Sequence, residues 1–114
     1  MDIKLKRVYD KPDASDGIRI LVDRLWPRGL TKEKAKIDIW AKEVAPSNEL
    51  RKWFHHEVGN WDEFIKRYHK ELAANNSAVV ELKKKIGQHS VTFVFGAKDT
   101  VHNNASVLRD YLLT

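Results

Sequence analysis

The stretch from Ile18 to Leu25 restricts the fold more than any other part of the chain. It is rich in branched apolar residues and nearly continuous, without the strict alternation of a strand that has one face in water. Such a run is typical of a strand buried on both faces, as in parallel sheets covered by helices. The segment from Ser90 to Ala97 repeats this character. An alternating segment from Ile3 to Tyr9 predicts a third strand, and Ile37 to Val44 a strand or extended piece.

The segments between these strands predict helices. Thr31 and Ser47 are suitable N-caps for helices over 32–36 and 48–55, and Asn60 with Glu63 resembles a capping box. Two longer helices have apolar residues at helical spacing, namely Trp61, Phe64, Ile65, Tyr68 and Leu72, then Val79, Leu82 and Ile86 before Gly87. Asp99 or Thr100 would cap the last helix.

Strands that alternate with helices predict an α/β fold. We expect a small single-domain three-layer sandwich over residues 1–114, with a mostly parallel sheet and helices on both faces. The length of 114 residues suits one domain with one core.

Several classes of protein are excluded by what the sequence lacks. The chain has no cysteine, which rules out disulfides, thiol catalysis and cysteine zinc sites. No apolar run approaches the roughly 20 residues that span a bilayer, and the N-terminus has no apolar signal core. We therefore expect a cytoplasmic protein without membrane association. Because no cofactor-binding motif is present either, we expect no tightly bound cofactor.

The charge of the chain favours anionic partners. Twenty-one Lys and Arg against 16 Asp and Glu give a net charge of +5 and a pI near 9.5. A small anionic ligand fits this balance, and nucleic acid would bind weakly through its phosphates. The alternative is that scattered lysines only keep a small protein soluble.

Two polar strings follow apolar strands, over 22–29 and 95–104. If the strands are parallel neighbours, both strings reach the edge where ligands bind in open α/β sheets. Arg24, Arg28 and Lys98, with the N-terminus of the last helix, would form an anion cradle there. Alternatively, Asp23 and Arg24 form a structural ion pair, while Trp26 and Pro27 close the end of the sheet.

Three residues of these strings are candidates for proton transfer: Asp23, Asp99 and His102. His102 is expected in the first turn of the last helix, where the helix dipole opposes a positive charge. The alternative is that His102 is a neighbour of the cap and faces water.

A third cluster follows Pro46. Ser47 would cap a helix that carries Arg51, and Arg24, Arg28 and Arg51 together would form a forked clamp for one anion. His55 and His56 are adjacent, whereas metal-binding pairs on helices are spaced three or four residues apart. We therefore predict no metal site.

The strings LVDRLWPRG (21–29), APS with ELRKWF (45–47 and 49–54), and AKD with HN (97–99 and 102–103) resemble the YeaO-like proteins, a family of short bacterial and archaeal domains of unknown function. The resemblance runs from Arg7 to Leu108 and implies a compact α/β domain. By match, it implies that these polar or aromatic positions recur: Asp23, Arg24, Trp26, Arg28, Ser47, Arg51, Trp53, His56, Lys98, Asp99, His102 and Asn103.

These observations give one leading hypothesis. The chain is a small enzyme or a ligand-binding domain for a phosphate- or nucleotide-like anion at the carboxyl ends of the strands. The ligand-binding candidates are Arg24, Trp26, Arg28, Ser47, Arg51, His56, Lys98 and Asn103. The alternatives are a nucleic-acid-binding module that uses net charge, and a non-catalytic interaction domain.

Overall fold

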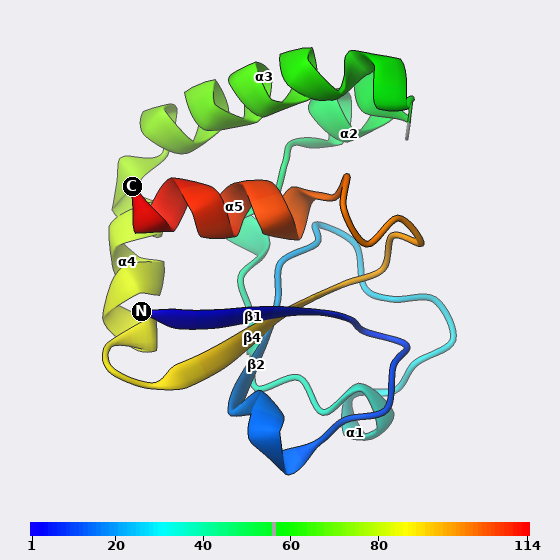
Figure 1. The fold of residues 1–114 in the computed structure, drawn as a ribbon, viewed down its shortest axis with the longest axis vertical. Coiled ribbons are helices and arrows are strands. Elements are labelled where there is room, and N and C mark those ends of the chain that lie inside the picture. Colours follow the sequence, from blue (N-terminus) through cyan, green and yellow to red (C-terminus); the bar gives the residue numbers. More distant parts are fainter. Residues whose placement is uncertain (56) are drawn as a thin grey trace.

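A four-stranded parallel sheet forms the centre of the molecule (Figure 1). The computed structural model describes residues 1–55 and 57–114. The strands are β1 (Asp2–Arg7), β2 (Ile18–Leu21), β3 (Ile39–Trp40) and β4 (Ser90–Phe95), in the order β1-β4-β2-β3. Every neighbouring pair is parallel, which confirms the α/β class.

Among the described residues, five α-helices pack around the sheet: α1 (Lys32–Ala35), α2 (Asn48–Phe54), α3 (Trp61–Ala74), α4 (Asn76–Ile86) and α5 (Asn104–Leu113). The last four share the main core with one face of the sheet, and α5 runs directly over the strands in Figure 1. In the described part of the chain, the other face is covered by the four-residue α1 with its loops and by the 3₁₀ helix Ala14–Asp16, and a smaller core there includes Leu21, Ala35 and Val94. The predicted helices on both faces are confirmed, but the two layers are very unequal.

The central strands β2 and β4 explain the continuous apolar runs. Ile20 and Phe93 face the main core, whereas Leu21 and Val94 face the smaller one, and all four are fully buried. The predicted strand over 18–25 is too long, since β2 ends at Leu21. After Val22 the chain bends away from the sheet, and this bend brings Asp23 to the end of β4.

Arg19 is the polar exception within the apolar run, and the structure pairs it. Its Nη1 lies 2.7 Å from Asp16 Oδ2, and its Nε and Nη2 donate to the carbonyl of Ala35 at 3.1 and 2.8 Å. Burial would raise the pKa of Asp16, but hydrogen bonds from Asp13 N–H, Arg19 and Lys6 outweigh it and keep that pKa below its usual value. A buried charge is tolerated here because its donors are satisfied.

The helix caps agree only in part with expectation. Thr31 and Ser47 accept hydrogen bonds from Lys34 N–H and Leu50 N–H, as predicted. Asn60 makes no side-chain cap bond, so the predicted capping box is wrong; a short 3₁₀ helix, Val58–Asn60, leads into α3 instead.

Two further expectations need correction. Helix α5 is capped by Asn103 rather than by Asp99 or Thr100. The 37–44 segment is mostly not a strand: two residues pair with β2, and Lys42–Val44 then form a 3₁₀ helix. In the part of the chain that the structure describes, no helix has the length and apolar character needed to cross a bilayer.

Candidate functional site

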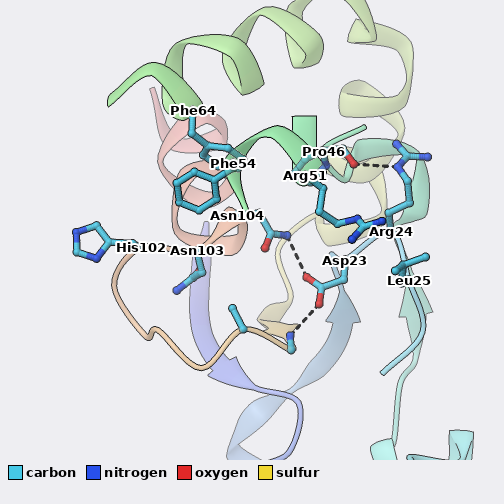
Figure 2. A pocket seen from close by; sticks show the side chains of 12 residues that line it. Asp23, Arg24, Leu25, Pro46, Arg51, Phe54, Phe64, His102, Asn103 and Asn104 are labelled. Carbon is cyan, nitrogen blue, oxygen red and sulfur yellow. Dashed lines mark hydrogen bonds between the residues drawn. The ribbon is translucent and has the colours of Figure 1, made fainter. Parts of the chain in front are cut away.

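A cavity of about 240 Å³ opens at the carboxyl ends of β2 and β4, between α2 and the start of α5 (Figure 2). We call it the strand-end cavity. Its lining residues are Asp23, Arg24, Leu25, Pro46, Arg51, Phe54, Phe64, Gly96, Ala97, His102, Asn103 and Asn104. As the two polar strings predicted, β2 and β4 are parallel neighbours and both strings contribute to this edge.

Asp23, from the first polar string, lines the cavity and is held there by two groups of the second string. Its Oδ2 accepts a hydrogen bond from Gly96 N–H at 2.8 Å, and its Oδ1 accepts one from Asn104 Nδ2 at 3.1 Å (Figure 2). Asn104 also donates to the carbonyl of Val22 at 2.9 Å, and Trp40 Nε1 donates to the carbonyl of Asp23 at 2.8 Å. The carboxylate therefore joins the ends of β2 and β4 to the first turn of α5.

Arg24 is oriented by backbone carbonyls. Its Nε donates to the carbonyl of Pro46 at 2.9 Å, and its Nη2 to that of Ala45 at 3.0 Å. These two hydrogen bonds are made to neutral groups. The carbonyls accept N–H groups from Nε and Nη2 but do not cancel the charge, so Arg24 both fixes the loop before α2 and adds a positive potential to the cavity.

Arg51 contributes a second guanidinium, from the middle of α2. Its side chain is exposed, and its Nη2 lies 3.4 Å from Asn48 Oδ1, which is a long and weak contact. Figure 2 shows the guanidinium extending toward the Asp23 side of the cavity. Two guanidinium groups thus line a cavity with one carboxylate among its described residues.

The opposite wall of the cavity is aromatic. Phe54 and Phe64 lie together there (Figure 2), with ring centroids 4.6 Å apart. Trp61 stacks behind Phe64 at 5.5 Å and 14°, and the ring of His102 meets Trp61 edge-on at 5.2 Å. The cavity therefore has a polar side and an apolar side.

A second hollow of about 450 Å³ shares Phe54, Gly96, Ala97 and His102 with the first. We call it the adjoining cavity. The exposed Lys98 lines it, as does Asp99. Lys98 therefore belongs to the same edge of the sheet as Asp23, but to the neighbouring hollow.

Asp99 and His102 form a local turn. Asp99 Oδ1 accepts the N–H groups of Val101 and His102 at 2.9 and 2.8 Å, and Oδ2 lies 3.0 Å from His102 Nδ1. The His102 N–H, followed by the Val101 N–H and the imidazole, lowers the pKa of Asp99 to about 2. His102 precedes α5 instead of lying in its first turn, and Figure 2 shows its ring pointing away from Asp23. The three candidates for proton transfer do not converge.

Asn103 lines the cavity as the cap of α5. It is buried, its Oδ1 accepts Ser106 N–H at 3.0 Å, and its Nδ2 donates to the carbonyl of Asp99 at 3.1 Å. Its polar atoms are therefore engaged in orienting the helix start.

Three predicted ligand-binding residues lie outside both cavities. Trp26 packs into the smaller core and meets Trp40 edge-on at 5.3 Å, because the bend after β2 turns it to the other face. Arg28 is exposed on the following turn, so the expected three-arginine clamp is wrong. Ser47 caps α2, and Glu71 accepts hydrogen bonds from its N–H and its Oγ at 2.9 and 2.6 Å.

His56 lies outside the described residues. Among residues 1–55 and 57–114, no group of three His, Asp or Glu side chains is placed to hold a metal ion.

Sequence reasoning missed the parts of the site that orient Asp23. Asn104 was not among the predicted site residues, although its amide donates both to Asp23 and to the carbonyl of Val22 after β2. Gly96 matters through its backbone, because a Cβ there would lie 3.2 Å from Asp23 Oδ2. The glycine that ends an apolar strand was the available signal for such a close approach.

Comparisons with known proteins find relatives along almost the whole chain. The family model described as the inactive DUF488-N3 subclade matches residues 2–114. The uncharacterized protein YeaO of Escherichia coli strain K12 is 46% identical over 112 residues, which cover 98% of this chain and 97% of the relative. An uncharacterized protein of Mycobacterium tuberculosis H37Rv is 43% identical over 110 residues, 96% of this chain and 92% of the relative. No solved structure matches.

Proposed function

Because the chain belongs to the inactive DUF488-N3 subclade, we propose that it is a non-catalytic domain that binds a small phosphate- or nucleotide-like anion in the strand-end cavity. The word "inactive" in the family description supports binding over conversion of the ligand.

The charge balance of the cavity carries this proposal. Arg24 and Arg51 bring two positive charges, and Asp23 brings one negative charge. Arg24 donates to carbonyls, whereas among residues 1–55 and 57–114 the Arg51 side chain makes only a long contact to Asn48, so the guanidinium of Arg51 is the more available of the two. An anion at this position would add charge-assisted hydrogen bonds and reduce the repulsion between two like charges. Lys98 in the adjoining cavity adds a third cation for a longer ligand.

The candidate catalytic residues support the same choice. Asp99 has a pKa of about 2 and is ionised at neutral pH, so it is poorly matched to general acid catalysis. The side chain of His102 is directed away from Asp23 (Figure 2), and a proton-transfer pair needs hydrogen-bond reach or one bridging water. Asp23 holds the N–H of Gly96 and the amide of Asn104, which is a positioning role.

Thermal unfolding with and without ligand tests the proposal. The probes are inorganic phosphate, sugar phosphates and nucleoside monophosphates, each at several concentrations. A probe at a hundred times its dissociation constant stabilises the domain by about 2.7 kcal/mol. We expect Arg51→Gln to abolish this stabilisation.

Arg28→Gln is the matched control. The substitution changes the net charge by the same amount, and Arg28 is exposed and lies outside the cavity. If no anion stabilises the protein, or if both variants lose the effect equally, the proposal is wrong.

A further inference from the structure

We infer that the anion bound in the strand-end cavity is attached to an aromatic ring, which packs against the wall formed by Phe54 and Phe64. This inference rests on the proposed function, and it adds the chemical class of the ligand. Nothing in the charge argument alone requires a ring.

The division of the cavity into two sides is the first observation. The charged and amide groups Asp23, Arg51 and Asn104 lie on one side in Figure 2, and Phe54 and Phe64 lie on the other. An inorganic oxyanion is small relative to about 240 Å³ and has no apolar surface to bury. A ligand that contacts both sides needs an apolar body in addition to its charged group.

The shape of the apolar side favours an aromatic ring. Phe54 and Phe64 are buried, and Trp61 stacks behind Phe64, so the wall is backed by packed side chains and cannot collapse into the cavity. A flat ring gains offset-stacked or edge-to-face contacts on such a wall, beyond the gain from buried area.

Leu25 provides the second observation. It lines the cavity beside Arg24, on the charged side (Figure 2), and 54% of its surface is exposed. A ligand whose ring packs on the aromatic wall and whose anion reaches the charged side would span the cavity, come against Leu25 and remove part of this apolar surface from water. Because Leu25 lies outside the buried core, its substitution tests the contact without disturbing the fold.

The experiment compares ligands that share an anion and differ in the ring, by isothermal titration of the full chain. The pairs are phenyl phosphate with inorganic phosphate, and benzoate with acetate. We expect at least one ring-bearing probe to bind about tenfold more tightly than its counterpart, or more. Cyclohexanecarboxylate should bind more weakly than benzoate if benzoate is the probe that binds.

A variant pair tests whether the ring-bearing ligand spans the cavity and covers Leu25. Leu25→Ser should reduce the preference for the ring-bearing probe several-fold and leave the ringless anion unaffected. Leu113→Ser is the control, because Leu113 is 52% exposed and lies far from the cavity lining. Equal binding of ring-bearing and ringless anions, or of cyclohexanecarboxylate and benzoate, would overturn this inference while the proposed function stands. If none of the anions binds, the proposed function itself fails.

Discussion

The carboxylate of Asp23, just after β2, is hydrogen-bonded to the residue just after β4, because its Oδ2 accepts the N–H of Gly96 at 2.8 Å. Parallel strands diverge from their ladder where they end, and the groups that leave the ladder need new partners. Here one side chain supplies the partner for β4 and also receives the amide of Asn104 from α5. The position of α5 relative to the sheet and the shape of the strand-end cavity therefore depend on the same residue.

We expect Asp23→Asn to destabilise the domain by about 1–2 kcal/mol, because the amide of Asn104 loses its carboxylate acceptor. An asparagine retains one oxygen for Gly96 N–H, but its NH₂ group then faces the amide of Asn104, which is also a donor. Urea unfolding measures the loss. Asp62→Asn makes the same charge change at an exposed position on α3 and should leave stability nearly unchanged. Equal stability of the two variants would contradict the bridging role.

Arg24 gives a contrasting prediction. Replacing it by Met leaves the carbonyls of Ala45 and Pro46 without their donors, so we expect a loss of about 1–3 kcal/mol in the free energy of unfolding. Arg28→Met should change stability by less than about 0.5 kcal/mol, as is usual at exposed sites. Denaturant melts of the free proteins separate the two. If Arg24→Met left the free energy of unfolding unchanged, these hydrogen bonds would contribute little to stability, and Arg24 would be available to bind the ligand.

The fold was predictable because its pattern is local. The apolar run of Ile20 to Val22, and that of Val91 to Phe95 with Thr92 as its one polar residue, indicate burial on two faces, and helical spacing predicts the apolar stripes of α3 and α4. The caps at Thr31 and Ser47 were predictable for the same reason, since a cap bonds to a group three residues away. Asn60 failed as a cap because the preceding 3₁₀ helix sets its backbone.

The site was predictable only as a region. Two polar strings after neighbouring strands locate the edge, but the direction of each side chain depends on bends that follow the strands. Trp26 turns to the smaller core, and Arg24 turns to carbonyls of a loop 21 and 22 residues away. The bonds of Ser47 to Glu71 and of Asn104 to Asp23 join distant segments, and no local pattern in one sequence reports them.

Acid should weaken the domain partly through Asp99. Its pKa is about 2 in the folded protein against 3.8 for the unperturbed group, because backbone N–H groups stabilise the charged form. A depressed folded-state pKa means that the unfolded chain binds the proton first, so this stabilisation is present above about pH 4 and is lost as the pH falls toward 2. Asp99→Asn keeps an acceptor for the N–H groups but removes the titration. The free energy of unfolding, measured with urea between pH 5 and 2, should therefore fall less steeply for the variant than for the unchanged protein. Parallel pH curves for the two proteins would contradict this contribution.

Binding to nucleic acid should be weak and governed by salt. The positive side chains are spread over separate elements, with Lys32 and Lys34 on α1 and Lys84 and Lys85 on α4, at different sides of the molecule in Figure 1. A scattered charge contacts few phosphates, and the affinity of such contacts falls linearly with salt on a logarithmic scale. We expect the anisotropy of a labelled duplex to show binding at 50 mM salt that decreases about tenfold or more by 200 mM, equally for unrelated sequences.

Arg51→Gln and Arg28→Gln should reduce this binding to the same small extent, because each removes one charge. Tight, sequence-selective binding at physiological salt, or a selective loss with Arg51→Gln, would instead make the strand-end cavity part of a nucleic-acid interface.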